Sequence, residues 1–215
     1  MKVKNGGVMQ PAAAFVDGKL DLETDLIFDP VCHIYKLATG EALPSVTQIL
    51  EASGVIDYSA LPNNTRNMAL QRGSFVHEAI HLDMQGELDW DTLDPILLPY
   101  VEAAAKFRNE FEVNGGLMEH RSFHPVYRYA GTLDYQPKKL LVDWKCGGAQ
   151  PWVRMQTAAY AALLPDPGSY RRIAVGLFPD GHYDATKEFR CADWFNDFND
   201  FLCCLRVAQL QKEGK

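Results

Sequence analysis

The segment YAGTLD, residues 129–134, is followed after a short break by LLVDWK, residues 140–145. Side chains alternate between the two faces of a β-strand. In residues 140–145 this alternation puts the three apolar positions 140, 142 and 144 on one face and both Asp143 and Lys145 on the other. A carboxylate and an ammonium group therefore project together from the end of a strand that is otherwise buried.

The break between the two segments sets how the strands pair. If Pro137-Lys138 is a two-residue hairpin loop, Leu141 lies opposite Asp134. Asp143 is then the same-face diagonal neighbour of Asp134, at roughly 7–8 Å between backbones, and both carboxylates can reach one cation. A slip of one residue would put the two carboxylates on opposite faces of the sheet. The chemistry therefore predicts the register.

Two carboxylates and a lysine suit phosphodiester hydrolysis. Carboxylate oxygens hold Mg²⁺ or Mn²⁺, which lowers the pKa of a bound water and contacts the phosphate. A lysine beside the metal can orient the water or stabilise the developing anion. A surface salt bridge on a hairpin is the alternative interpretation of Asp143 and Lys145 when they are taken alone.

Further motifs in the same order resemble a known superfamily. Gly131-x-x-Asp134, Asp143-x-Lys145 and Gln156-x-x-x-Tyr160 resemble the PD-(D/E)XK nucleases, specifically their RecB-like exonuclease branch. Upstream, the segment RGSFVH, residues 72–77, resembles the RG-[ST]-x-x-H segment of that branch. The resemblance covers about residues 45–190. It implies a restriction-endonuclease-like core with a metal-dependent DNA exonuclease activity in recombination, repair or replication.

The resemblance also implies roles for individual residues. His77, Asp134 and Asp143 would be metal ligands, with the Val142 or Trp144 carbonyl as a further ligand, and Lys145 would be the catalytic lysine. Glu119 would polarise a water or stabilise that lysine, although Glu110 and Glu112 compete for its place. The residues expected to contact DNA are Gln156, Tyr160, Arg72, Ser45, Trp152 and Arg154.

These contacts differ in the physical reason behind them. An exposed Trp152 could stack on a base, although a tryptophan at a helix start is more often part of the core. Ser45 and Thr47 could donate to a phosphate at a helix N-terminus, but the Ser45-x-x-Gln48 capping box already explains Ser45. A DNA groove further predicts that five basic side chains lie together: Arg66, Arg72, Lys145, Arg154 and Arg171.

Two other functions are compatible with parts of the sequence. His77-Glu78-Ala79-Ile80-His81 matches H-E-x-x-H, in which Glu78 would act as the base of a zinc protease and Glu102 is a conceivable third ligand. Met84 and Glu87 stand where the metzincin extension needs glycine and histidine. A catalytically silent DNA-binding or assembly module on the same fold is the second alternative, and it need not keep His77, Asp134, Asp143 and Lys145 together.

Composition limits the class of protein. The chain has 215 residues with a net charge of −7, which argues against coating nucleic acid by bulk charge but not against a locally basic groove. No apolar run is long enough for a membrane helix, and Met1–Gly7 does not resemble a secretory signal. We expect a cytoplasmic protein, in a bacterium or a phage-infected cell, with a possible recombination or replication partner protein.

Cysteine spacing argues against disulfide bonds and against metal sites built from cysteine thiolates. The five cysteines include no C-x-x-C pair, so neither a disulfide framework nor a four-thiolate zinc site is expected. Some relatives in the resembling branch carry a four-cysteine iron–sulfur cluster. Cys191, Cys203 and Cys204 do not reproduce that spacing, so no iron–sulfur cluster is expected.

Hydrophobic periodicity predicts an α/β (α+β) fold with a mixed central sheet flanked by helices. We expect one domain over residues 1–215: a lead-in and hairpin in 1–44, the core in 45–190 and a C-terminal helix in 191–215. Helices are predicted at 45–54, 63–86, 94–113, 151–164 and from 193, with Asn63 or Asn64 as the N-cap of the second and Asp94 as the N-cap of the third. In the last helix we expect Asp197 and Asp200 to face water and an apolar face formed by Phe195, Phe198, Phe201, Leu202 and Leu205. Strands are predicted at 14–16, 26–28, 33–37, 117–123, 126–136, 139–145, 172–178 and 182–189.

Overall fold

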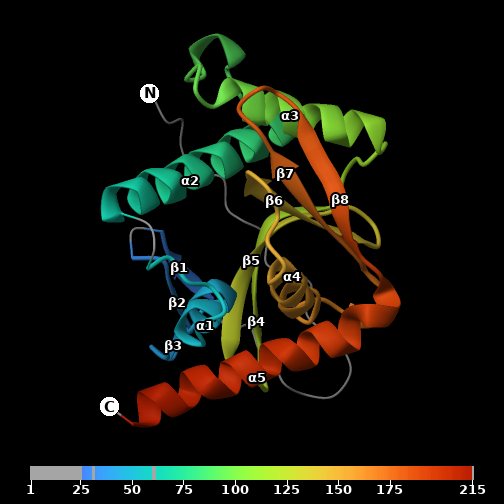
Figure 1. Ribbon diagram of the computed structural model, residues 1–215. Coiled ribbons are helices and arrows are strands. Elements are labelled where there is room, and N and C mark those ends of the chain that lie inside the picture. Colours follow the sequence, from blue (N-terminus) through green and yellow to red (C-terminus); the bar gives the residue numbers. More distant parts are fainter. Residues whose placement is uncertain (1–25, 31, 60–61, 215) are drawn as a thin grey trace.

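The computed structural model describes residues 26–30, 32–59 and 62–214. Within these residues it contains five α-helices, a three-stranded sheet and a five-stranded mixed sheet (Figure 1), so the predicted α/β fold class is confirmed. The strand expected at Ala14–Val16 and the segment Met1–Gly7 lie outside the described residues. None of the helices in the described ranges combines the length and the apolar character that crossing a membrane requires.

The five-stranded sheet has the strand order β4-β5-β6-β7-β8. Strands β6 and β7 are parallel, and the other neighbours are antiparallel. Helix α4, Val153–Ala161, makes the crossover that two consecutive parallel strands require. The strands are β4 Leu117–His124, β5 Tyr129–Gln136, β6 Leu140–Cys146, β7 Arg171–Leu177 and β8 Tyr183–Phe189.

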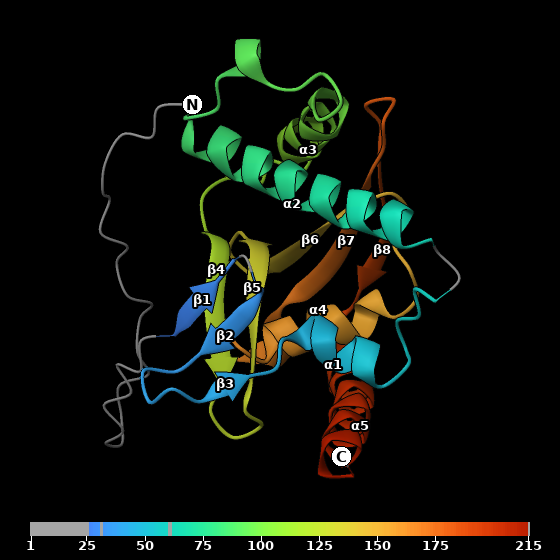
Figure 2. The ribbon, with the colours of Figure 1, turned by 90° about the vertical axis from the view of Figure 1, so that its left-hand side faces the viewer.

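Helices cover both faces of this sheet. Helices α2, Asn63–Gln85, and α3, Leu98–Glu110, lie across one face, with α2 running over the strand ends (Figures 1 and 2). Val142 and Trp144 belong to the apolar cluster on that side. Leu141 belongs to a second cluster, formed with α1, α4 and α5. Strand β6 is therefore buried on both faces, and its alternating side chains enter two different apolar clusters.

The small sheet joins the large one through the start of α1. It consists of β1 Ile27–Asp29, β2 Ile34–Lys36 and β3 Ala42–Leu43. Helix α1, Val46–Ala52, begins at Ser45, whose side chain accepts from the Gln48 N–H at 3.1 Å while Gln48 Oε1 accepts from the Ser45 N–H. The predicted capping box is therefore confirmed. Ser45 also bridges to Ala130 of β5, which fixes α1 against the central sheet.

Several element boundaries differ from the prediction. Helix α2 begins after Pro62 and has no side-chain cap, so the predicted cap by Asn63 or Asn64 is wrong. Helix α3 begins three residues after Pro95, because Asp94 instead closes a turn by accepting from Ile96. Strand β5 begins at Tyr129, because residues 125–128 form the hairpin turn.

The predicted register between β5 and β6 is also wrong. Tyr135 pairs with Val142, which puts Asp134 opposite Asp143 rather than opposite Leu141. The connection contains three residues, 137–139, and Lys138 adopts a left-handed conformation with φ of 52°. A longer loop of this kind is a common hairpin type, and its register cannot be read from Pro137-Lys138 alone. The observed register differs from the predicted one by two residues, so Asp134 and Asp143 still lie on the same face of the sheet.

The final helix α5, Trp194–Glu213, corrects two further predictions. Asp197 was expected on the solvent face, but it is 6% exposed and accepts from buried Arg172 and from Arg154. Phe195 was expected on the apolar face, but it is 63% exposed. Asp200 does lie at the surface. In the first turn of the helix Asp197 therefore enters the core and Phe195 does not, whereas Phe198 and Phe201 are buried as their spacing predicts.

We expect Gly116→Ala to destabilise the protein by about 2–3 kcal/mol, since strained backbone and steric overlap each cost this order of free energy. Gly116 has φ of 100°, and a Cβ there would lie 2.2 Å from the Gln136 carbonyl oxygen. Gly148→Ala is the control, because its Cβ would meet no atom within 4 Å. Urea denaturation of both variants measures the difference, and equal stabilities would contradict this account of the β4–β5 edge.

Candidate functional site

Three carboxylates form a row across three neighbouring strands. Met118 pairs with Tyr135 and His120 with Leu133, so Glu119 of β4 lies opposite Asp134 of β5. Asp134 in turn lies opposite Asp143 of β6 by the register given above. Like charges directly opposite one another destabilise a sheet, so such a row needs compensating positive charge.

One compensating group comes from α2. Val76, Ala79 and Ile80 pack into the core against the sheet, which holds His77 between them over the strand ends. The Nδ1 atom of His77 lies 3.4 Å from Asp134 Oδ1 and 3.9 Å from Glu119 Oε1. Its Nε2–H donates to the Trp144 carbonyl at 3.1 Å. His77 thus ties the helix to β5 and β6 at the acidic row.

The second compensating group is Lys145. Its Nζ lies 2.6 Å from Asp143 Oδ2, and Asp143 is 1% exposed. Asp134 accepts from the Trp144 N–H at 2.8 Å, so the backbone between Asp143 and Lys145 is anchored to the neighbouring strand. The carboxylate and ammonium that the sequence puts on one face do meet at the end of β6.

Burial makes this cluster electrostatically costly. Burial and then the Asp134 charge raise the pKa of Glu119 to about 7. Burial also raises the pKa of Asp143 to about 6, against the opposing effect of Lys145. Burial alone would lower the pKa of His77, but Asp134 and Glu119 raise it to about 9. For Asp134 the effect of burial is outweighed by His77 and Lys145, and its pKa is lowered.

The donor set fits a hard divalent cation. One ligand atom from each of His77, Glu119 and Asp134 lies within 4.8 Å of the others. Carboxylate oxygens with one imidazole nitrogen suit Mg²⁺ or Mn²⁺. Burial and the Asp134 charge raise the pKa of Glu119, so a cation bound beside it would stabilise the charged carboxylate. The structure thus groups Glu119 with His77 and Asp134. The resemblance implies Asp143, not Glu119, as the third ligand. In the structure Asp143 is instead paired with Lys145.

Gln156 and Tyr160 lie on one face of α4, as their spacing predicts. Gln156 Nε2 donates to the Tyr160 hydroxyl at 3.0 Å and to Thr47 Oγ1 at 3.4 Å, which links α4 to α1. Both side chains are buried, at 5% and 8% exposure. A Cβ at Gly131 would lie 2.8 Å from the Tyr160 ring, so glycine lets Tyr160 pack against β5. Tyr160 packs in the same cluster as Leu141, and burial and then the charges of Asp143 and Asp134 raise the pKa of its hydroxyl, so this face of α4 lies next to the acidic row.

The five basic side chains expected in one groove do not all lie together. Arg72 contacts Cys146, the residue after Lys145, and lies 5.7 Å from the Tyr100 ring. Arg171 pairs with Leu140 at the opposite end of β6 and bonds to Glu188. Arg154 is neutralised by Asp197 and Asp200 of α5. Arg171 therefore does not share one groove with Lys145, whereas the contact of Arg154 with DNA stays a prediction.

The other predicted contacts are placed as follows. Ser45 is 3% exposed, and its hydroxyl oxygen accepts the hydrogen bond of the capping box from the Gln48 N–H. Trp152 is partly buried at the start of α4, with Lys145 Nζ 5.8 Å from its ring centroid. Arg66 lies over the Tyr58 ring at 4.7 Å and pairs with Glu51 at 3.6 Å.

Two further residues near the site, Arg121 and Tyr58, are not predicted from the sequence. Arg121 is two residues after Glu119 on β4, and its charge lowers the Glu119 pKa against the effect of burial. The strand period of two could have identified it as a same-face neighbour of Glu119. Tyr58 lies in the loop after α1, and Lys145 and Arg66 act on its hydroxyl. No periodic pattern in that loop gives a signal for Tyr58.

Solved structures of similar fold have low sequence identity to this chain. A candidate exonuclease from Eubacterium rectale is 13% identical, with 75% of this chain and 73% of that chain covered and a TM-score of 0.47. LHK-Exo, an alkaline exonuclease from Laribacter hongkongensis, is 14% identical, with 79% and 92% covered and a TM-score of 0.31. Its complex with dAMP gives 15% identity, 80% and 93% coverage, and a TM-score of 0.30. No protein-family profile and no curated protein matches the chain.

Proposed function

We propose that this protein is a metal-dependent DNA nuclease, acting as an exonuclease in DNA recombination, repair or replication. The observation that carries the proposal is the row of Glu119, Asp134 and Asp143 on adjacent strands, with His77 and Lys145 at its two sides. A partly buried row of like charges is costly to maintain, which favours a role in binding a cation.

Within the proposal, His77, Glu119 and Asp134 would hold the metal, with Asp143 and the Trp144 carbonyl beside them. A bound Mg²⁺ or Mn²⁺ would supply a water of lowered pKa and positive charge next to the phosphate. Asp134 also holds the β6 backbone through the Trp144 N–H, which fixes the distance between its own carboxylate and Asp143.

Lys145 has the role of stabilising negative charge on the phosphate. Its Nζ is held by Asp143 at 2.6 Å, and Asp143 raises the pKa of the lysine against the effect of burial, so the ammonium stays charged. A fixed cation in a poorly hydrated site acts more strongly on developing charge than one in water. Gln156 and Tyr160 order this region through their link to Thr47.

The zinc-protease alternative finds less support. In the described part of the chain, the group of possible metal ligands around His77 contains Glu119 and Asp134, not His81 or Glu102. Glu102 lies on α3 near Gly181, in the β7–β8 connection. The silent-module alternative is not favoured by any observation, because the charged groups needed for hydrolysis are close together.

The test is cleavage of end-labelled linear single- and double-stranded DNA and of closed circular DNA, with Mg²⁺, Mn²⁺ or EDTA. We expect nucleotides to be released from linear DNA with either metal, no release with EDTA, and intact circles. The Asp143→Asn variant, purified identically, controls for a contaminating nuclease. Failure to cleave any DNA with either metal would refute the proposal, and peptidase activity that is lost in Glu78→Gln would establish the protease instead.

A further inference from the structure

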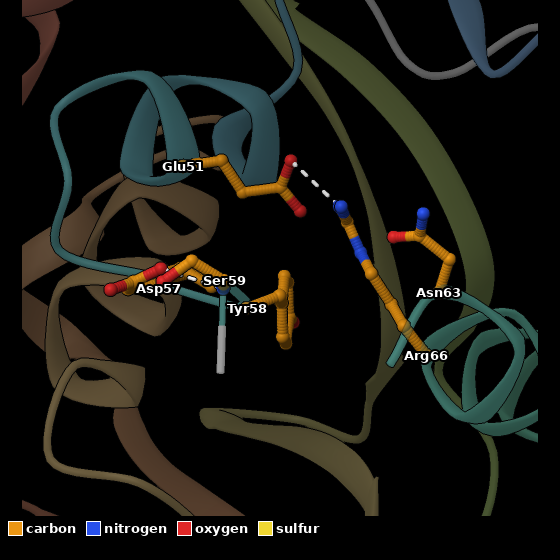
Figure 3. A pocket seen from close by; sticks show the side chains of 7 residues that line it. Glu51, Asp57, Tyr58, Ser59, Asn63 and Arg66 are labelled. Carbon is orange, nitrogen blue, oxygen red and sulfur yellow. Dashed lines mark hydrogen bonds and ion pairs between the residues drawn. The ribbon is translucent and has the colours of Figure 1, made fainter. Parts of the chain in front are cut away.

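A cavity of about 310 Å³ opens between α1, the loop that follows it and the first turns of α2 (Figure 3). Ligand pockets start at about 300 Å³, so this cavity has room for one small organic group. In Figure 3, Glu51 and Arg66 reach toward each other across the opening, and the Tyr58 ring stands between them and the loop. The lining residues are Glu51, Ile56, Asp57, Tyr58, Ser59, Asn63 and Arg66.

Arg66 marks where a flat group can lie in this cavity. Its guanidinium is 4.7 Å from the Tyr58 ring centroid, so a planar group already rests on that ring. It pairs with Glu51 at 3.6 Å, and both side chains are about one third exposed, at 36% and 34%. Exposed pairs of this kind are weak and exchange readily with other partners. A ligand can therefore take the place of the guanidinium on Tyr58.

The cavity adjoins the proposed catalytic lysine. Tyr58 and Trp152 both pack against the apolar cluster that contains Tyr160. Lys145 Nζ lies 5.8 Å from the Trp152 ring, and the charges of Lys145 and Arg66 oppose the rise that burial causes in the Tyr58 pKa. Trp152 thus lies beside Lys145, where a nucleic acid strand would pass, and Tyr58 packs against the same cluster as Trp152.

The charges in the cavity indicate which part of a nucleotide enters. The carboxylates of Glu51 and Asp57 line it and would repel a phosphate, whereas a neutral base meets no such penalty. Base–aromatic stacking is tolerant of sequence because every base has a π face. Arg66, once displaced from Tyr58, would be free to contact the adjoining phosphate.

We propose that this cavity is a subsite for one unpaired nucleotide, whose base stacks on Tyr58, and that the protein therefore prefers single-stranded DNA to blunt duplexes. A base inside a duplex is already stacked and paired, and extracting it costs free energy that an unpaired base does not. The inference rests on the proposed nuclease function and adds the strand preference to it.

The test compares Michaelis constants for a single-stranded oligodeoxynucleotide and for a blunt duplex of the same length. In Tyr58→Leu we expect KM for the single strand to rise about tenfold with kcat little changed, which is the scale of one lost stacking contact. Tyr58→Phe keeps the ring and should keep the wild-type KM. Phe195→Leu, an exposed aromatic on α5, is the remote control and should also behave as wild type.

A series of oligonucleotides, each with one abasic site at a different distance from the end, tests the stacking itself. We expect one position at which the missing base raises KM for the wild type but not for Tyr58→Leu. Wild-type KM in Tyr58→Leu, or a blunt duplex cleaved faster than the single strand, would overturn the subsite while leaving the nuclease function intact. Absence of cleavage of every substrate would overturn both.

Discussion

Replacing Lys145 with alanine is expected to lower the rate of DNA cleavage by about 10²- to 10⁴-fold, the range over which a positioned charged or proton-transferring group acts. Lys145 is the ammonium group held by Asp143 at the end of β6, at 2.6 Å from Oδ2. Without it, charge that develops on the phosphate loses its fixed partner. The proposed metal ligands His77, Glu119 and Asp134 remain, so we expect Mn²⁺ binding to persist.

Lys139→Ala is the matched control for this variant. Lys139 lies just before β6, is exposed, and bonds to Ser169 on the surface. We expect its cleavage rate to stay within about twofold of wild type, as is usual for surface substitutions away from a site. Circular dichroism melts verify that both variants fold. Lys145→Ala with more than about a tenth of wild-type activity would refute the role given to this lysine.

Replacing Arg172 with methionine is expected to lower the free energy of unfolding by about 3 kcal/mol, the lower end for breaking a buried ion pair. Arg172 is fully buried and donates to Asp197 Oδ2 at 2.8 Å and to the Arg154 carbonyl at 2.9 Å. Its loss leaves the Asp197 carboxylate inside the core. Arg154, which also contacts Asp197 at 2.8 Å, limits the damage.

Arg171→Met is the control, since it removes the neighbouring arginine of the same strand. Arg171 is exposed and pairs with Glu188, and such surface pairs contribute about 0–1 kcal/mol. Urea denaturation of both variants gives the comparison. Equal losses of stability for Arg171→Met and Arg172→Met would show that the buried network around Asp197 does not stabilise the fold as described.

Local signals in the sequence predicted the parts of the fold that depend on local chemistry. The alternation in residues 140–145 put Asp143 and Lys145 on one face, and they form an ion pair. The capping box at Ser45 formed as expected because both partners lie within one helical turn. Gln156 and Tyr160 share a face of α4 because residues four apart on a helix are neighbours.

The parts that failed depend on contacts distant in sequence. The register of Asp134 against β6 followed from a three-residue loop and from the bond between its carboxylate and the Trp144 N–H. Asp197 enters the core only because Arg172, 25 residues away, is buried beside it. Arg154 pairs with Asp197 and Asp200 of α5, which the sequence does not predict, and its contact with DNA stays a prediction. No periodic pattern reports such long-range pairing.

The grouping of Glu119 with His77 and Asp134 also depends on contacts between residues that are distant in the sequence. Sequence order put Glu119 on the first strand of the meander, with Glu110 and Glu112 as competitors. The β4–β5 register puts Glu119 directly opposite Asp134, whereas Glu110 ends α3 and bonds to Tyr183. Pairing of strands, rather than spacing, selects the acid that meets His77.

Binding of Mn²⁺ to the wild-type protein, followed by electron paramagnetic resonance of the free ion, tests most directly the central claim that the acidic row is a metal centre. We expect saturable binding by the wild type and at least tenfold weaker binding by Asp134→Asn, because a metal site that loses a charged ligand typically loses this much or more. Asp166→Asn, which changes an exposed acid outside the row, should bind as the wild type does. Equal Mn²⁺ binding by wild type and Asp134→Asn, or none by either, would contradict the account.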